Sequence, residues 1–121
     1  MEIISGKIVK GAGLGKGFGF PTINIPYFGH LSGVFAGIVA MANKSYPAAI
    51  NIGSRPTVDD KQNICEAFLL TWNSDENIPL GTTIEIELKE KIRDTKKFAN
   101  FEDLKLQIAK DVEFVKTCYN L

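Results

Sequence analysis

The stretch VFAGIVAMANKSYPAAINI, residues 34–52, predicts two strands joined by a tight turn. Val34 to Ala42 is an apolar run, and Asn43-Lys44 interrupts it before a second run from Ser45 to Ile52. A short break of turn-forming residues between two such runs is typical of a β-hairpin. We therefore expect a fold that is mainly β.

Three further stretches predict strands, namely Ile3 to Val9, Ile64 to Trp72 and Thr83 to Lys91. In the last of them, isoleucine and leucine alternate with charged residues, as in an antiparallel strand with one exposed face. Closing several short strands into a small barrel removes their exposed edges. A small β-barrel is therefore the expected architecture.

Only the C-terminal tail has a helical pattern. Asn100 is a suitable N-cap, and Asp103 lies three residues further on, as in a capping box. The apolar stripe that follows consists of Leu104, Ile108, Val112 and Val115. A C-terminal α-helix can cover one side or one mouth of the barrel. Since no repeat or linker interrupts the chain, we expect residues 1–121 to form a single domain.

The composition excludes several functional classes. The formal net charge is zero, which argues against a nucleic-acid partner and against a polybasic membrane surface. No segment reaches the roughly 18 apolar residues of a membrane span, and no apolar signal segment opens the chain. Cys65 and Cys118 have no metal-type or redox-type spacing, so we expect two buried free thiols. These features predict a cytoplasmic protein, and we expect it to be a monomer.

The segment GAGLGKGFGFPTIN, residues 11–24, has glycine at every second position from 11 to 19. It is not a Walker A loop, because Gly17 stands where Ser or Thr is needed. No helical pattern follows it, as a dinucleotide-binding GxGxxG would require. The bare backbone N–H groups can approach an anionic ligand. A mobile loop without a ligand is the alternative, and the glycines alone leave both interpretations open.

The end of this segment is more specific. Phe20 precedes a proline and is therefore expected to be extended. An extended Thr22-Ile23-Asn24 points Thr22 and Asn24 to one side, with Ile23 toward the core. A hydroxyl and an amide oxygen suit Mg²⁺, which binds through few protein groups and substrate phosphates. Local capping or an Asx turn is the alternative.

Glu66 is unusual because it is the only charged residue in the apolar run ICEAFLLTW. An unpaired buried carboxylate is costly, so such a residue is paired, lies at a strand end or is kept for function. In a low-dielectric setting its pKa rises and it can act as a general base.

Two polar stretches and one histidine have both structural and functional interpretations. NIGSRPT, residues 51–57, predicts a rigid polar turn, in which Arg55 either pairs with an anion or lies at the surface. KEKIRDTKKF, residues 89–98, is either a solvated strand end or a flap whose Arg93 reaches an anionic or planar ligand. His30 lacks a second ligand nearby and is expected to be incidental.

Taken together, these stretches resemble the ATP-dependent riboflavin kinases. GKIVKGAGLGKGFGFPTIN is similar to the opening of that family, a glycine-rich segment that runs into Gly-Phe-Pro-Thr-Ala-Asn. The segments GVFAGIV, NIGSRPTV, ICEAFLLTW, PLGTTIEIEL, KIRDTKKF and DLKLQIAKDV follow in the family's order. The resemblance covers nearly the whole chain. It implies a six-stranded Greek-key β-barrel with a C-terminal α-helix, which transfers the γ-phosphate of ATP to the 5′-hydroxyl of riboflavin to give FMN.

The resemblance also implies roles for individual residues. Those expected to bind the nucleotide are Gly11, Gly13, Gly15, Lys16, Gly19, Pro21, Thr22 and Asn24. Thr22 and Asn24 would also contact Mg²⁺, with Zn²⁺ or Mn²⁺ as alternatives. Glu66 falls on the catalytic carboxylate that takes the proton of the ribityl hydroxyl. The flavin flap would contain Arg93 and Phe98, and a supporting loop would contain Asn51 and Arg55.

The chain departs from the family pattern at several positions. Ile23 replaces alanine on the side away from the ligand, and Lys16 replaces a common arginine. Phe68, Leu80 and Thr95 replace a histidine, a tyrosine and a glutamate, which affects flavin packing and flap closure more than the chemistry. In bacteria this domain often follows an adenylyltransferase that makes FAD. Because only five residues precede Gly6, no FAD synthetase activity is expected from this chain.

Three rival functions remain at this level. A small barrel can bind single-stranded nucleic acid, although the neutral charge argues against it. A flavin-binding barrel without turnover is the second, and a kinase that uses another nucleotide donor is the third. An assay of FMN formation with each nucleoside triphosphate separates these alternatives.

Overall fold

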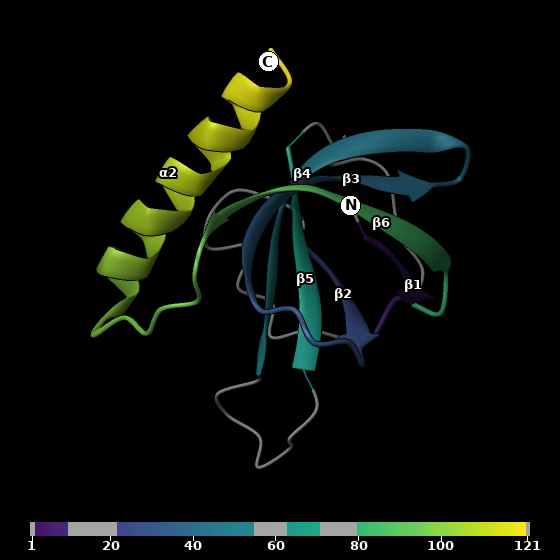
Figure 1. The fold of residues 1–121 in the computed structure, drawn as a ribbon, viewed down its shortest axis with the longest axis horizontal. Helices are drawn as coiled ribbons and strands as arrows, with labels where there is room; N and C mark the ends of the chain where they lie inside the picture. The colour runs from purple at the N-terminus through teal and green to yellow at the C-terminus, as the bar shows by residue number, and fades with distance from the viewer. Residues whose placement is uncertain (1, 10–21, 55–62, 71–79, 121) are drawn as a thin grey trace.

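Figure 1 shows a computed structural model of the chain, which describes residues 2–9, 22–54, 63–70 and 80–120. Within these residues the elements are β1 (Ile3–Lys7), β2 (Thr22–Tyr27), β3 (Gly33–Met41), β4 (Lys44–Ser54), β5 (Asn63–Leu69), β6 (Thr83–Arg93) and α2 (Phe101–Cys118). The expected mainly β fold, a six-stranded Greek-key barrel with a C-terminal helix, is confirmed. Among the described residues, no helix is long and apolar enough to cross a membrane.

The six strands form one antiparallel sheet in the order β1-β6-β3-β4-β5-β2. The two outermost strands of this order meet where the Val9 N–H donates to the Asn24 carbonyl oxygen at 2.8 Å. This bond closes the sheet into a barrel and satisfies backbone groups that an open edge would expose.

The predicted hairpin is present as β3 and β4, which pair from Gly33↔Ile52 to Met41↔Lys44. Its turn consists of Ala42 and Asn43, so the expected break at Asn43-Lys44 is wrong by one residue. Both turn residues have positive φ, 51° and 63°. Two positive φ values are typical of a type I′ turn, whose twist matches that of the flanking strands.

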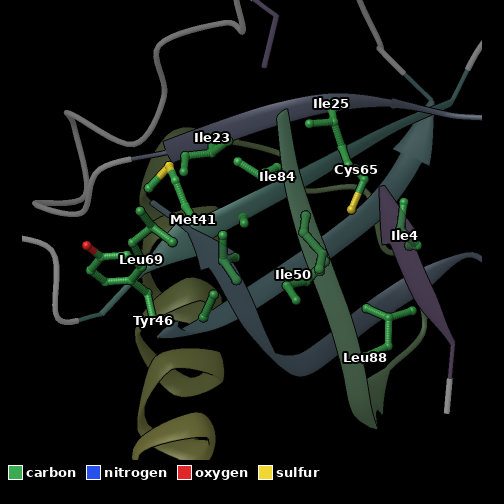
Figure 2. Close-up of a cluster of buried hydrophobic side chains, with 14 of the residues drawn as sticks. Ile4, Ile23, Ile25, Met41, Tyr46, Ile50, Cys65, Leu69, Ile84 and Leu88 are labelled. Carbon is green, nitrogen blue, oxygen red and sulfur yellow. The ribbon is translucent and has the colours of Figure 1, made fainter. Parts of the chain in front are cut away.

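The barrel interior is filled by side chains from alternate positions of every strand. Figure 2 shows Ile4, Ile23, Ile25, Ile50, Cys65, Leu69, Ile84 and Leu88 gathered there. Burying one such isoleucine or leucine stabilises the fold by about 1.5–3 kcal/mol. Because the interior is packed with side chains, any site must lie on the outer face or at a mouth of the barrel.

A second apolar cluster joins α2 to the outer face of the barrel (Figure 1). Its buried members are Ala36, Ala49 and Phe68 from the strands and Ile108, Val112 and Val115 from the helix. As expected, Asn100 caps α2: its side-chain oxygen accepts a hydrogen bond of 2.9 Å from the Asp103 N–H. The helix therefore covers part of the outer face.

Two strands extend further than expected. β4 continues to Ser54 because Gly53 and Ser54 pair with β5, so it runs two residues beyond the expected end at Ile52 into the predicted polar turn. β6 continues to Arg93, which places that residue at the end of a strand. The expectation that both thiols are buried holds for Cys65 but is wrong for Cys118, which is exposed at the end of α2.

Candidate active site

One row of residues crosses five neighbouring strands of the barrel. Asn24 of β2 lies opposite Glu66 of β5, and Glu66 lies opposite Asn51 of β4. Asn51 in turn lies opposite Val34 of β3, which lies opposite Arg93 of β6. We call this set the outer row. It brings together four of the residues singled out in the sequence.

The three polar residues at the β2 end of the row share the outer face. Successive side chains of a strand point to opposite faces, and directly opposite residues point to the same face. The residues on either side of them belong to the buried inner core: Ile23, Ile25, Ile50, Ile52, Cys65 and Ala67. Asn24, Glu66 and Asn51 therefore point outward together.

Glu66 lies in the middle of this polar group. Its carboxyl is half-buried, and burial raises its pKa above the ordinary value. Among the described residues, no ion pair offsets this cost. A carboxylate withdrawn from water and left without a cation is a stronger proton acceptor than an exposed one.

Thr22 and Asn24 provide oxygen atoms beside this carboxyl. Asn24 is 6% exposed, and the Thr22 Oγ1 is buried without a hydrogen-bond partner among the described residues. Buried hydroxyls are normally partnered, so an orphaned oxygen indicates a missing ligand or a functional role. An all-oxygen donor set fits Mg²⁺ or Mn²⁺ better than Zn²⁺, which favours nitrogen and sulfur. The residues present therefore fit the divalent ion that the resemblance implies.

At the opposite end of the outer row, Arg93 forms an ion pair with Asp111. The Arg93 Nε donates to Asp111 Oδ1 at 3.0 Å, and Nη2 donates to Oδ2 at 2.8 Å. Asp111 lies on α2 and also accepts a hydrogen bond of 3.1 Å from the Gln107 amide. A two-point contact of this kind is strong and orients both partners. Arg93 thus joins the end of β6 to the helix.

The segment after Arg93 lies close to the end of β4. The Phe98 ring centroid is 5.9 Å from the Arg93 guanidinium carbon and 5.6 Å from the Lys96 Nζ. The Thr95 hydroxyl donates a long hydrogen bond of 3.4 Å to the Ile52 carbonyl oxygen. This segment therefore reaches the residue that follows Asn51 in the chain.

Several predicted site residues lie outside the described residues: Gly11, Gly13, Gly15, Lys16, Gly19, Pro21 and Arg55. Of the others, Thr22, Asn24, Asn51 and Glu66 lie together, whereas Arg93 and Phe98 lie toward the helix. Sequence reasoning missed Asp111 as the partner of Arg93. The signal was present, because Asp111 is an acidic residue at a helical position next to Val112 of the apolar stripe.

Sequence comparisons with known proteins agree on one family. The sequence model of the flavokinase family, described as riboflavin kinase, matches residues 2–119. The bifunctional riboflavin kinase/FMN adenylyltransferase of Escherichia coli (strain K12) is 39% identical over 112 residues, 89% of this chain and 35% of that protein. The chain therefore spans about a third of the length of that relative.

Two solved structures share the fold. The riboflavin kinase from Trypanosoma brucei aligns with a TM-score of 0.64 and 24% identity, over 98% of this chain and 79% of that one. A protein from Streptococcus pneumoniae described as a macrolide-efflux protein aligns with a TM-score of 0.78 and 25% identity, over 94% of this chain and 38% of that one.

Proposed function

The chain belongs to the riboflavin kinase family, and we propose that it transfers the γ-phosphoryl group of ATP to the 5′-hydroxyl of riboflavin. The products are FMN and ADP. The observation that carries the proposal is the half-buried Glu66 carboxyl, which lies between two amides and beside the orphaned Thr22 hydroxyl. Such a group is suited to accept a proton from an alcohol in a site that also holds phosphates.

Glu66 acts as the general base in this proposal. Its carboxylate takes the proton of the ribityl hydroxyl while the hydroxyl oxygen forms a bond to the γ-phosphorus. The bond between that phosphorus and the β–γ bridging oxygen breaks, and ADP leaves with the electron pair. Little covalent assistance is needed, so correct positioning of the hydroxyl and the phosphate provides most of the rate.

Thr22 and Asn24 are the proposed metal-binding residues. Their oxygens lie on the Glu66 side of the outer face, and Thr22 Oγ1 lacks another partner among the described residues. When bound there, Mg²⁺ neutralises the charge of the phosphates. The remaining nucleotide contacts are assigned to the glycine-rich segment, which contains Gly11, Gly13, Gly15, Lys16, Gly19 and Pro21.

The flavin is assigned to the other end of the outer row. Arg93 and Phe98 form a cationic and aromatic surface there, suited to a planar ligand. Arg55, which follows β4 in the chain, keeps its proposed supporting role. We further propose that the reaction takes place in the cytoplasm on one copy of the chain.

One assay tests this function. Purified protein is incubated with riboflavin, Mg²⁺ and each nucleoside triphosphate in turn, and FMN is separated from riboflavin by chromatography. FMN that forms with ATP and requires Mg²⁺ supports the proposal. Riboflavin binding without FMN from any donor would overturn it in favour of a flavin-binding barrel.

A further inference from the structure

Asn51 is placed next to Glu66 by the pairing of two interior strands. β4 and β5 pair without a register shift from Ala48↔Leu69 to Ser54↔Asn63, and this ladder puts Asn51 directly opposite Glu66. Side chains opposite each other in an antiparallel pair have Cβ atoms about 4.5–5.5 Å apart. An asparagine amide can therefore reach a glutamate carboxyl across this pair by rotation of the side chains alone.

The other neighbours of Asn51 offer its amide little. Its opposite residue on β3 is Val34, and the next outward positions along β4 are Ala49 and Gly53. Among the described residues that border Asn51 in the sheet, Glu66 is therefore the one with a polar side chain. A half-buried amide needs a hydrogen-bond partner, and a carboxylate accepts such bonds strongly.

The two amides beside Glu66 differ in their surroundings. Asn24 belongs to β2, two residues from the orphaned Thr22 hydroxyl, and is assigned with it to the metal ion. Asn51 lies on the far side of Glu66 from both residues. Its amide is therefore free of the metal and available to the carboxyl.

We propose that Asn51 is a positioning residue for Glu66. The Asn51 Nδ2–H donates to one carboxylate oxygen of Glu66 and leaves the other oxygen to face the substrate hydroxyl. This inference rests on the proposed function. A neutral donor suits the task, since it fixes the carboxylate without cancelling the charge that attracts the proton. A lysine or arginine at this position would instead form a tight pair and weaken the base.

The test compares steady-state FMN formation in the wild type and in matched variants. Asn51→Leu removes the amide at similar volume, and Asn51→Asp keeps the shape but replaces the donor by a second carboxylate opposite Glu66. We expect each to lower kcat by roughly 10- to 100-fold, because a misplaced group costs about that much. KM for riboflavin and for ATP should change less than about threefold, since Asn51 touches neither substrate.

Two further variants separate positioning from a purely structural role. The double variant Glu66→Gln/Asn51→Leu should be no slower than Glu66→Gln, because without its base Asn51 has nothing to orient. Asn63→Leu is the matched control. Asn63 is also half-buried and pairs across the same β4–β5 ladder, with Ser54, but it lies three residues from Glu66. It should keep kcat within about twofold of the wild type.

The outcomes are distinct. Wild-type kcat in a folded Asn51→Leu or Asn51→Asp would overturn the positioning role while leaving the kinase function intact, as would fully additive losses in the double variant. Where circular dichroism shows that Asn51→Leu does not fold, the smaller Asn51→Ala, which removes the amide without adding a charge, decides the question. A wild-type protein that makes no FMN would overturn the proposed function, and the inference about Asn51 with it.

Discussion

Glu66 and Asp111 are two carboxyl groups withdrawn from water, one on the outer face of the barrel and one on the helix that packs against it, and their surroundings differ. Asp111 receives two hydrogen bonds from Arg93 and one from Gln107. Glu66 has amides on both sides, and within the described residues no cation pairs with it. A buried carboxylate that no cation pairs with stays reactive. One that is fully paired and hydrogen-bonded instead holds two structural elements together. The comparison supports the proposed role of Glu66 as a general base and gives Asp111 a structural role, the attachment of α2 to the barrel.

The largest expected effect is on activity at Glu66. Glu66→Gln keeps the shape of the side chain but removes the base, so kcat for FMN formation should fall by about 10²–10⁴-fold. Asp111→Asn is the companion variant, and it should affect kcat far less. Equal losses in the two variants would remove the distinction between the two carboxyls.

The next effect is on stability at Asp111. Asp111→Ala leaves Arg93 without its partner, and the Arg93 side chain is only 20% exposed. The free energy of unfolding in urea should fall by roughly 2 kcal/mol, less than for a fully buried pair because water reaches the guanidinium.

An exposed ion pair provides the control for Asp111. Lys116→Ala breaks the contact of 3.5 Å with Glu113 on the same helix and should cost no more than about 0.5 kcal/mol. If Asp111→Ala lowered the free energy of unfolding as little as Lys116→Ala, the Arg93–Asp111 contact would not anchor the helix to the barrel.

A third prediction concerns the orphaned hydroxyl of Thr22. Thr22→Val replaces a buried, unpartnered oxygen by a methyl group, so the stability should be unchanged or slightly higher. The Mg²⁺ concentration for half-maximal FMN formation should rise by roughly 10-fold through loss of a ligand. Thr83→Val, at an exposed position of β6, should leave both quantities unchanged. A normal Mg²⁺ requirement in Thr22→Val would argue against a metal at this position.

The smallest effect is the stability cost of keeping Glu66 ionised. Its folded-state pKa lies above the ordinary value of 4.5, so the folded protein binds this proton more tightly than the unfolded chain. Stability from this group is complete below pH 4.5 and is lost as pH rises through the folded-state pKa.

Glu66→Gln should therefore be more stable than the wild type at pH 7, by about 1 kcal/mol or less, with the difference vanishing below pH 4.5. Urea unfolding at several pH values, without Mg²⁺, measures this difference. A wild type that is more stable than Glu66→Gln at pH 7 would indicate that a cation compensates the carboxylate.

Local patterns explain what could be predicted from the sequence. The hairpin at residues 34–52, the alternation in residues 83–91 and the Asn100 cap depend on neighbours along the chain. Glu66 stood out because it is the only charge in its run. The turn was misplaced by one residue because Asn43 can form a two-residue turn with either Ala42 or Lys44. The pairing of Met41 with Lys44 shows that the turn is Ala42-Asn43.

Long-range pairing explains what could not be predicted from the residues themselves. The register that puts Asn24 and Asn51 on either side of Glu66 joins three strands that lie far apart in the sequence. Similarly, the Arg93–Asp111 contact depends on where α2 lies against the barrel. Asp111 was missed because periodicity highlights apolar residues, and the sequence does not name the distant partner of an acid beside the apolar stripe.

The bond that closes the barrel, from the Val9 amide to the Asn24 carbonyl, has a consequence for dynamics. The same residue joins the seam with its backbone, and its buried side chain is a proposed ligand of the metal ion. Occupancy of the site and opening of the seam are then thermodynamically linked, so a ligand that orders Asn24 reduces the population of opened molecules. Amide hydrogen exchange at Val9 should slow on addition of Mg²⁺ and nucleotide, and unchanged exchange there would show that the seam opens independently of the site.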